Sequence, residues 1–285
     1  NKGMKQYRFI FLGLVLLITS AISAQDVISA TDLAKISGNK DVVVVWAGAE
    51  DGYKVHITGS VSVPHTTLCN NEPVRNLIKS PAEMAKILGA KGISTDKTIV
   101  VYDEGSGKYA GRMYWILKYL GAPNVKMLDG NMKAWKAKRK PITGSPTKVA
   151  AATFTPKTDA SVLAKIVDAK QANGNASVVL VDARTPEEFA GTAESEIRKG
   201  HIPGAVNVNH ETLLNAKGEL KSKEELKALF EAKGITANKT VITYCESSVR
   251  AGLVFLALKG LDYPNVKVYD GAYLEWQSTA SNKVE

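Results

Sequence analysis

The fold of this chain is decided by one stretch in its second half, Val241-Ile242-Thr243-Tyr244-Cys245-Glu246-Ser247-Ser248-Val249-Arg250-Ala251-Gly252. A β-branched run ends at a cysteine, a short polar loop follows, and an apolar segment from Leu253 to Leu258 continues with helical spacing to Gly260. The order strand, loop and helix predicts that Cys245 lies between the carboxyl end of a strand and the amino end of a helix.

This position favours a reactive thiolate at Cys245. Successive loop amides and the positive end of the helix dipole can point at its sulfur atom, and Arg250 adds a fixed positive charge. Such surroundings stabilise the thiolate, which is the nucleophilic form of cysteine. The alternative is a buried, unreactive cysteine at a strand end. The two serines and the arginine that follow favour the nucleophile.

The chain also contains an internal repeat. Residues 91–102, Lys-Gly-Ile-Ser-Thr-Asp-Lys-Thr-Ile-Val-Val-Tyr, match residues 233–244, Lys-Gly-Ile-Thr-Ala-Asn-Lys-Thr-Val-Ile-Thr-Tyr. Residues 123–130 and 264–271 match in the same way, and both begin with Pro-Asn-Val-Lys. The repeat predicts a duplicated domain.

Each copy alternates β-rich runs with helical runs, which predicts an α/β fold. The runs expected to form buried strands are Val42 to Trp46, Ile99 to Tyr102, Val125 to Leu128, Val178 to Val181, Val241 to Tyr244 and Val266 to Tyr269. We expect one parallel sheet per copy, flanked by helices on both faces, with a ligand site outside the carboxyl ends of the strands. The predicted domains are residues 26–140 and 157–285, joined by a linker at residues 141–156 that contains proline and glycine.

Capping boxes mark the start of three predicted helices. In each, a serine or threonine precedes a glutamate by three residues, so that the two side chains can bond each other's backbone amides. The three capping residues are Ser80, Thr185 and Ser222.

The length of the loop after Cys245 bears on whether the site transfers sulfur or binds phosphate. Four residues lie between Cys245 and Arg250, whereas phosphatase loops place five residues between cysteine and arginine to wrap a phosphate. The shorter ring suits a single extra sulfur atom better than a phosphoryl group. The stretch resembles the active-site loop of the rhodanese family of sulfurtransferases, and the resemblance spans nearly all of residues 26–280. It implies two tandem rhodanese-like domains.

The resemblance assigns the chemistry to the second copy. The first copy has Asp103 where the second has Cys245, and a carboxylate cannot carry sulfane sulfur. We therefore expect a catalytically inactive first domain that walls one side of the site, as in tandem-domain thiosulfate and 3-mercaptopyruvate sulfurtransferases. The implied function is transfer of sulfane sulfur from thiosulfate or 3-mercaptopyruvate, through a persulfide on Cys245, to cyanide or a thiol.

The predicted site is centred on catalytic Cys245. The residues expected to bind substrate are Glu246, Ser247, Ser248, Val249, Arg250 and Arg198. The segment Val181-Asp182-Ala183-Arg184-Thr185-Pro186-Glu187-Glu188-Phe189 resembles a second family signature. Within it, Asp182 and Arg184 are expected to form a supporting buried pair at a strand end. Gly200-His201-Ile202-Pro203-Gly204-Ala205 is the second part of this signature, and there His201 is expected to satisfy backbone groups at a turn.

Departures from the family pattern leave the donor open. Glu188 stands where the thiosulfate and mercaptopyruvate enzymes have a donor-binding arginine, and Arg198 is one place from the position of a second arginine in the mercaptopyruvate enzymes. Glu246-Ser247-Ser248 has neither the cationic pair of typical thiosulfate enzymes nor the Gly-Ser-Gly of typical mercaptopyruvate enzymes. Glu246 would repel an anion a few ångströms away by about 1 kcal/mol even in water, unless its side chain faces solvent.

Two other classes of function are compatible with the sequence. The first is a persulfide carrier or partner-binding module with little turnover, which the missing donor arginine favours. The second is a phosphatase or arsenate reductase with the same fold, which the short loop disfavours. No dissociable cofactor is expected, and no metal site is predicted, because His65 and His210 occupy equivalent places of the repeat and would lie in different domains.

The amino-terminal residues resemble a targeting signal. Lys5 and Arg8 precede an apolar run from Phe9 to Ile18, and small residues lead to Ala24. This pattern predicts a signal peptide at residues 1–24, cut after Ala24 or after Ala21, with an uncleaved anchor as the alternative. The protein is then expected to be periplasmic or secreted, with membrane contact only through the export signal.

The charge and the cysteine content of the chain indicate which classes of partner the protein can have. Without residues 1–24 the net charge falls from +9 to +6, and no basic cluster interleaved with aromatic residues suggests nucleic acid. The two cysteines, Cys69 and Cys245, could form one disulfide in an exported protein, but the surroundings of Cys245 favour a free thiol. A thiol-redox partner would then keep Cys245 reduced or persulfidated.

Overall fold

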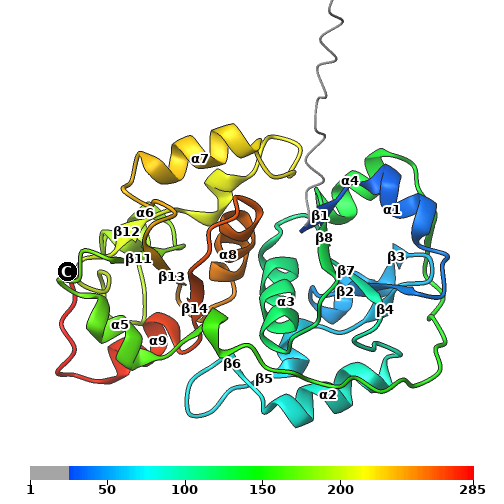
Figure 1. Ribbon diagram of the computed structural model, residues 1–285, viewed down its shortest axis with the longest axis horizontal. Coiled ribbons are helices and arrows are strands. Elements are labelled where there is room, and N and C mark those ends of the chain that lie inside the picture. Colours follow the sequence, from blue (N-terminus) through cyan, green and yellow to red (C-terminus); the bar gives the residue numbers. More distant parts are fainter. Residues whose placement is uncertain (1–25) are drawn as a thin grey trace, which may run out of the picture.

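Two five-stranded sheets form the framework of the protein, one in each half of the chain (Figure 1). The computed structural model describes residues 26–285, so the predicted signal peptide at residues 1–24 lies outside the described residues. Neighbouring strands within both sheets run parallel, as the alternation of β-rich and helical runs predicts.

The two sheets have equivalent strand orders, β1-β8-β7-β2-β4 and β10-β14-β13-β11-β12. The six strands predicted from the sequence are all present, and they form the three central strands of each sheet. The strands are β1 (Val27–Ile28), β2 (Val42–Trp46), β4 (Val61–Ser62), β7 (Thr98–Tyr102), β8 (Val125–Leu128), β10 (Leu163–Ala164), β11 (Val178–Asp182), β12 (Val206–Asn207), β13 (Thr240–Tyr244) and β14 (Val266–Tyr269).

Helices cover both faces of each sheet. They are α1 (Ala30–Ile36), α2 (Pro81–Ala90), α3 (Lys108–Tyr119), α4 (Asn131–Ala137), α5 (Ile166–Ala172), α6 (Pro186–Phe189), α7 (Lys223–Glu231), α8 (Ala251–Gly260) and α9 (Ala272–Ser278). The predicted capping boxes are confirmed at the starts of α2, α6 and α7. Each satisfies amides that the first helical turn would otherwise leave without partners.

The strand β2 illustrates why the central runs are apolar throughout. Val43 and Val45 belong to the core beneath α2 and α3, whereas Val44 and Trp46 belong to the core beneath α1 and α4. Because both faces of the sheet are covered, neither set of alternating side chains meets solvent. The first domain is therefore a three-layered α/β structure, and the second domain repeats this arrangement.

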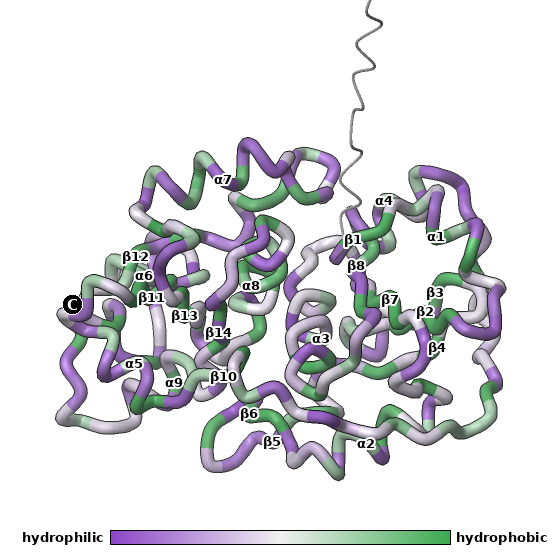
Figure 2. Tube along the Cα trace, in the orientation of Figure 1, coloured by the Kyte–Doolittle hydropathy of each residue, from purple (hydrophilic) through white to green (hydrophobic). Residues whose placement is uncertain are grey.

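The helix α8 is enclosed on all sides. Figure 2 shows hydrophobic residues along α8, whereas hydrophobic and hydrophilic residues are mixed along α7. Residues 251–258 of α8 are all buried, because one face packs on its own sheet and another packs on α3 of the first domain. The helix that follows Cys245 is thus part of the interface between the domains.

A buried ion pair also crosses this interface. Arg112 of α3 donates a hydrogen bond of 2.7 Å to the carboxylate of Asp270, which directly follows β14. The Arg112 side chain is fully buried and that of Asp270 is 9% exposed. The second carboxylate oxygen of Asp270 accepts a hydrogen bond from the amide of Ile78 at 3.0 Å. A carboxylate of the second domain therefore neutralises a buried cation of the first domain at the interface.

Two short antiparallel pairs complete the first half. β3 (His56–Ile57) pairs with β9 (Ile142–Thr143), and β5 (Cys69–Asn70) pairs with β6 (Leu77–Ile78). β9 lies within residues 141–156, which the sequence predicts as a linker, and this segment packs on the first domain through a 2.9 Å hydrogen bond from the Ala152 amide to Gly89. Among residues 26–285, no helix has both the length and the apolar character needed to cross a membrane.

Candidate active site

Cys245 follows β13 directly, at the carboxyl edge of the second sheet, and is 1% exposed. Residues 246–250 form the loop that leads into α8. The carbonyl groups of Cys245 and Glu246 accept hydrogen bonds of 3.0 Å from the amides of Tyr273 and Leu274 in α9. The predicted order of strand, loop and helix is confirmed, and α9 fixes the position at which the loop leaves the sheet.

The turn of the loop is centred on Ser248. This residue has a φ of 66°, in the left-handed region that residues other than glycine seldom adopt. Its hydroxyl group is buried and donates a 3.1 Å hydrogen bond to the carbonyl of Tyr269 at the end of β14. The side chain therefore stabilises a backbone conformation that is unfavourable by itself.

The equivalent loop of the first domain contains a bound anion, the carboxylate of Asp103. Its oxygens accept hydrogen bonds of 2.9 to 3.2 Å from the amides of Gly105, Gly107, Tyr109 and Ala110. Successive backbone amides that converge in this way form a nest for negative charge. Burial and the neighbouring Glu104 raise the pKa of Asp103 to about 6, although the amides favour its ionised form. In the first domain the loop amides thus point at the side chain of the first residue after the strand, and Cys245 is the first residue after the equivalent strand of the second domain.

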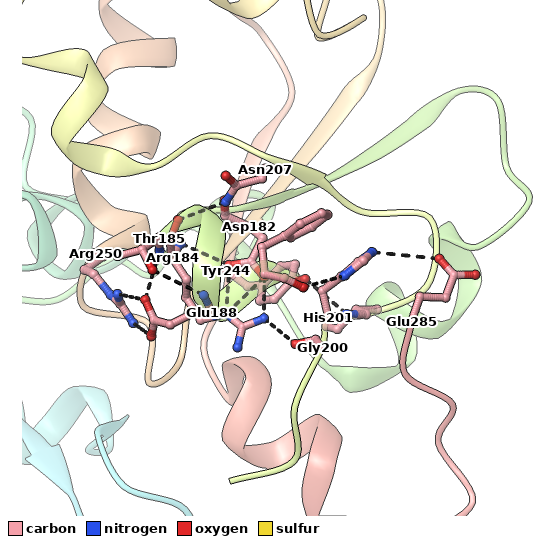
Figure 3. Close-up of polar contacts among 12 residues, drawn as sticks. Asp182, Arg184, Thr185, Glu188, Gly200, His201, Asn207, Tyr244, Arg250 and Glu285 are labelled. Atoms are coloured by element: carbon pink, nitrogen blue, oxygen red, sulfur yellow. Dashed lines mark hydrogen bonds and ion pairs between the residues drawn. The ribbon is translucent and has the colours of Figure 1, made fainter. Parts of the chain in front are cut away.

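Arg250 closes the second loop and is held by Glu188 of α6. The guanidinium donates two hydrogen bonds to the carboxylate, of 2.6 and 2.8 Å, and the two side chains point at each other in Figure 3. Burial opposes ionisation of Glu188, but Arg250 and the amide of Thr185 outweigh it and lower its pKa to about 2. Burial likewise opposes the charge of Arg250, whereas Glu188 and a negatively charged Cys245 raise its pKa above the ordinary value. The positive charge that the loop itself contains is therefore already paired.

Asp182 and Arg184 form the predicted buried pair at the end of β11. The two side chains are 0% and 2% exposed, and they are joined by hydrogen bonds of 2.7 to 3.0 Å. Arg184 also donates to the carbonyl of Gly200 at 2.8 Å (Figure 3). Its guanidinium lies over the ring of Tyr273. This pair connects α9, β11 and the segment before His201.

His201 has the structural role expected from the sequence. Its Nδ1 atom lies 2.8 Å from the carbonyl oxygen of Phe189, and the two rings stack with centroids 3.6 Å apart. The amide of His201 pairs with the carboxyl-terminal residue Glu285 at 2.8 Å. These contacts fix the turn that follows Gly200.

A cleft of about 680 Å³ lies between the two domains in front of the loop. Its second-domain wall includes Ser247, Val249 and Arg250, and most of the residues that line it have polar or charged side chains. The other lining residues are His65, Thr66, Asn71, Arg75, Asn76, Ser106, Lys108, Tyr109, Thr185, His210, Glu211 and Leu214. The first domain therefore walls one side of the cleft.

The turn between β5 and β6 brings two first-domain residues to the loop that follows Cys245. Asn76 donates a 3.0 Å hydrogen bond to the hydroxyl of Ser247, and Arg75 forms an ion pair with Glu246. The Glu246 side chain is 30% exposed, and its ion pair with Arg75 offsets the repulsion expected between this carboxylate and an anion in the cleft. Sequence reasoning missed both residues, because 171 positions separate each from its partner.

Two histidines also face this cleft. His65 and His210 begin equivalent 3₁₀ helices, His65–Leu68 and His210–Leu213, one in each domain. Burial and nearby cations lower the pKa of each imidazole to about 4, so both are neutral at pH 7. The repeat places them in different domains, as predicted, but the domains meet so that both line one cleft. Within residues 26–285, no three His, Cys, Asp or Glu side chains are grouped so that they could hold a metal ion.

Arg198 is not brought to the cleft. Its guanidinium donates to the carbonyl of Asn282 at 3.0 Å, and its amide donates to the side chain of Gln277 at 3.2 Å. It lines a small hollow that also contains Arg184 and Glu188. The structure therefore separates Arg198 from the other residues that the sequence proposes for substrate binding.

Both cysteines are free. Cys69 donates a 3.4 Å hydrogen bond to the carbonyl of His65, and burial raises the pKa of its thiol although Arg112 opposes this shift. Burial therefore disfavours the nucleophilic thiolate form of Cys69, and Cys245 is the candidate nucleophile because of its place between β13 and α8.

Comparison with known proteins identifies the domain type. The rhodanese-like domain model matches residues 29–138 and 163–279, one match in each half of the chain. The Escherichia coli (strain K12) 3-mercaptopyruvate sulfurtransferase is 32% identical over 241 residues, which cover 83% of this chain and 85% of that protein. The Pseudomonas aeruginosa thiosulfate sulfurtransferase is 31% identical over 268 residues, with coverages of 91% and 96%.

Two further comparisons bear on structure and function. The crystal structure of SseA, a 3-mercaptopyruvate sulfotransferase from Escherichia coli, superimposes with a TM-score of 0.80 at 30% identity and covers 87% of this chain and 98% of SseA. The sulfur carrier protein TtuD of Thermus thermophilus is 34% identical over 238 residues, with coverages of 78% and 82%. Relatives of similar identity thus include proteins named for sulfur transfer and one named for sulfur carriage.

Proposed function

The chain belongs to the rhodanese family of sulfurtransferases, and we propose that it moves sulfane sulfur from thiosulfate or 3-mercaptopyruvate to cyanide or a thiol through a persulfide on Cys245. The observation that carries this proposal is the equivalence of Cys245 and Asp103. The Asp103 carboxylate is bound by loop amides, and an anionic sulfur at Cys245 occupies the corresponding place of the second domain.

The first step loads the cysteine. The Cys245 thiolate attacks the outer sulfur of thiosulfate, a sulfur–sulfur bond forms on Cys245, and the bond within thiosulfate breaks with its electron pair leaving on sulfite. With 3-mercaptopyruvate, the carbon–sulfur bond breaks instead, and the electron pair and a proton go to the carbon of the pyruvate product. In both cases the terminal sulfur of the persulfide carries the negative charge.

The second step discharges the persulfide. The acceptor attacks the terminal sulfur, the sulfur–sulfur bond breaks, and its electron pair returns to Cys245 as the thiolate. Loop amides that stabilise the anion in both forms lower the barrier of each step, because they need not reorganise during the reaction. Ser248 supports this role through its bond to Tyr269, which maintains the turn.

A sulfur carrier with little turnover of its own is the second candidate. Two observations favour it: the resemblance to the sulfur carrier protein TtuD, and the presence of Glu188 at the position of the family's donor-binding arginine. Such a carrier would accept sulfur on Cys245 and release it only to a partner protein.

Turnover assays distinguish the two candidates. Thiocyanate formation from cyanide is measured with thiosulfate and with 3-mercaptopyruvate, using wild-type protein, Cys245→Ser and the control Cys69→Ser. The enzyme proposal predicts turnover with at least one donor, its loss in Cys245→Ser and its retention in Cys69→Ser. Persulfide formation without repeated turnover would support the carrier, and the absence of both would contradict sulfur transfer.

Export is a separate part of the proposal. It rests on the resemblance of residues 1–24 to a signal peptide, and it requires a partner that keeps the Cys245 thiol reduced or persulfidated outside the cytoplasm. Amino-terminal sequencing of the protein from the periplasm or medium is expected to begin at Gln25. An uncleaved chain confined to the cytoplasm would contradict export.

A further inference from the structure

Three positively charged residues line the cleft, and they are not equally available to a substrate. They are Arg75, Lys108 and Arg250. Arg250 is bound by Glu188 through two hydrogen bonds, and their side chains are only 18% and 22% exposed. Because this pair carries no net charge, its attraction for an anion in the cleft is weak. The two remaining cations both belong to the first domain.

Arg75 can exchange its partner. Its ion pair with Glu246 lies at the surface, with side chains that are 57% and 30% exposed. Ion pairs in such surroundings contribute little to stability, because water and salt screen them. A sulfur donor with a carboxylate or sulfonate-like group can therefore replace Glu246 as the partner of Arg75, and bidentate binding by the guanidinium suits either group. The neighbouring Asn76 holds this turn against Ser247 of the catalytic loop.

Lys108 lies where its charge reaches both walls of the cleft. It is the first residue of α3, and its ammonium group is 4.9 Å from the centre of the Tyr109 ring. Burial and a neighbouring arginine, Arg112 or Arg250, are larger causes of the lowered pKa values of His65 and His210. Lys108 lowers both pKa values further. One lysine of the first domain therefore acts on residues of both domains. Glu211 of the second domain also lines the cleft.

We propose that Arg75 and Lys108 of the first domain bind the anionic group of the sulfur donor, and that Glu246 forms its ion pair with Arg75 only when no donor is bound. The inactive domain then supplies the recognition charge, while the second domain supplies the nucleophile. This assignment rests on the proposed function, since it names the residues that recognise the donor. It also explains why a glutamate can stand at position 188, where related enzymes have a donor-binding arginine. If the first domain binds the donor, the side chain of Glu188 can pair with Arg250 instead.

Steady-state kinetics test the assignment with matched variants. Arg75→Gln and Lys108→Gln are compared with Lys86→Gln, which removes an exposed charge from α2. Each of the first two is expected to raise the KM for thiosulfate about tenfold with little change in kcat, because binding common to ground and transition states is lost. Glu246→Gln is expected to lower that KM.

Sulfite binding separates failure of this inference from failure of the proposed function. Calorimetry with the Cys245→Ala protein measures anion affinity without sulfur transfer, and the double variant Arg75→Gln/Lys108→Gln is expected to weaken sulfite binding about 100-fold. If the wild-type protein never forms a persulfide but this loss is observed, the anion site stands and sulfur transfer is wrong. If sulfur transfer occurs while affinity and KM change no more than in Lys86→Gln, the first-domain assignment is overturned.

Discussion

Gly111 and Gly252 face each other where α3 crosses α8, so closely that a Cβ atom added to either would lie 2.5 Å from a backbone atom of the other helix. Both glycines belong to the first turn of their helices. The contact therefore lies beside the loops that follow Asp103 and Cys245. Backbone contact at this point brings the two sheet edges together and positions the cleft between them.

Gly252→Ala is expected to destabilise the protein by about 1–3 kcal/mol, because the added methyl group overpacks a contact between backbones. Gly260→Ala is the matched control, since it lies in the same helix and an added Cβ atom there would meet nothing within 4 Å. The control should be neutral or slightly stabilising. Urea unfolding measures both, and an equal effect of the two substitutions would contradict the close approach.

Asp270→Asn is expected to cost about 3–5 kcal/mol of the free energy of unfolding, because it leaves the buried guanidinium of Arg112 without its counter-charge. The pair formed by Asp262 and Lys223 provides the control, since its charged atoms are 3.8 Å apart and the Asp262 side chain is 85% exposed. Asp262→Asn should change stability by less than about 1 kcal/mol. Similar losses in the two variants would show that the interdomain pair has no special role.

Glu188→Gln is expected to release Arg250 into the cleft. The variant should lose about 1–3 kcal/mol of stability, because a partly buried pair is broken, and it should bind thiosulfate more tightly because the cleft gains a positive charge. Glu187→Gln removes an exposed charge from the same helix and serves as the control. An unchanged KM for thiosulfate in Glu188→Gln would show that Arg250 does not reach the donor.

The neutral histidines of the cleft predict an acid-sensitive fold. The pKa of His65 and that of His210 are lowered from 6.5 to about 4, so between these values the unfolded chain binds protons that the native protein does not. Stability from this source is therefore complete above pH 6.5 and falls as the pH drops towards 4. Across this pH range, each histidine changes the free energy of unfolding by up to about 3 kcal/mol.

His65→Gln and His210→Gln test this dependence. Each variant should flatten the decline in unfolding free energy between pH 6.5 and 4, and the double variant should flatten it most. Chemical denaturation at several pH values provides the measurement. A decline as steep as in the wild-type protein would contradict the assignment.

The central architecture could be predicted from the sequence because it depends on local patterns. The β-branched runs gave the three central strands of each sheet, and the capping residues gave the starts of α2, α6 and α7. The short edge strands β1, β4, β10 and β12 contain two residues each and carry no periodic signal. The strand, loop and helix around Cys245 could be predicted because they follow one another directly along the chain.

The first-domain side of the cleft could not be predicted in this way. Arg75 and Lys108 stand in loops and helix starts with no motif, and they reach the cleft only because the domains pack through Gly111 and Gly252. Arg198 illustrates the opposite case. Its sequence position suggests substrate binding, but its guanidinium is bound to the carboxyl-terminal segment through Asn282. The role of Glu188 as partner of Arg250 likewise depends on a contact between distant segments.

Intact-protein and peptide mass spectrometry of the mature chain after incubation with thiosulfate tests the persulfide at Cys245 most directly. One sulfur atom should be added, the peptide containing Cys245 should carry it, and cyanide should remove it. Cys69→Ser should behave like the wild-type protein, and Cys245→Ser should remain unmodified. A reduced, folded protein that gains no sulfur from thiosulfate or 3-mercaptopyruvate, or gains it on Cys69, would contradict the persulfide at Cys245.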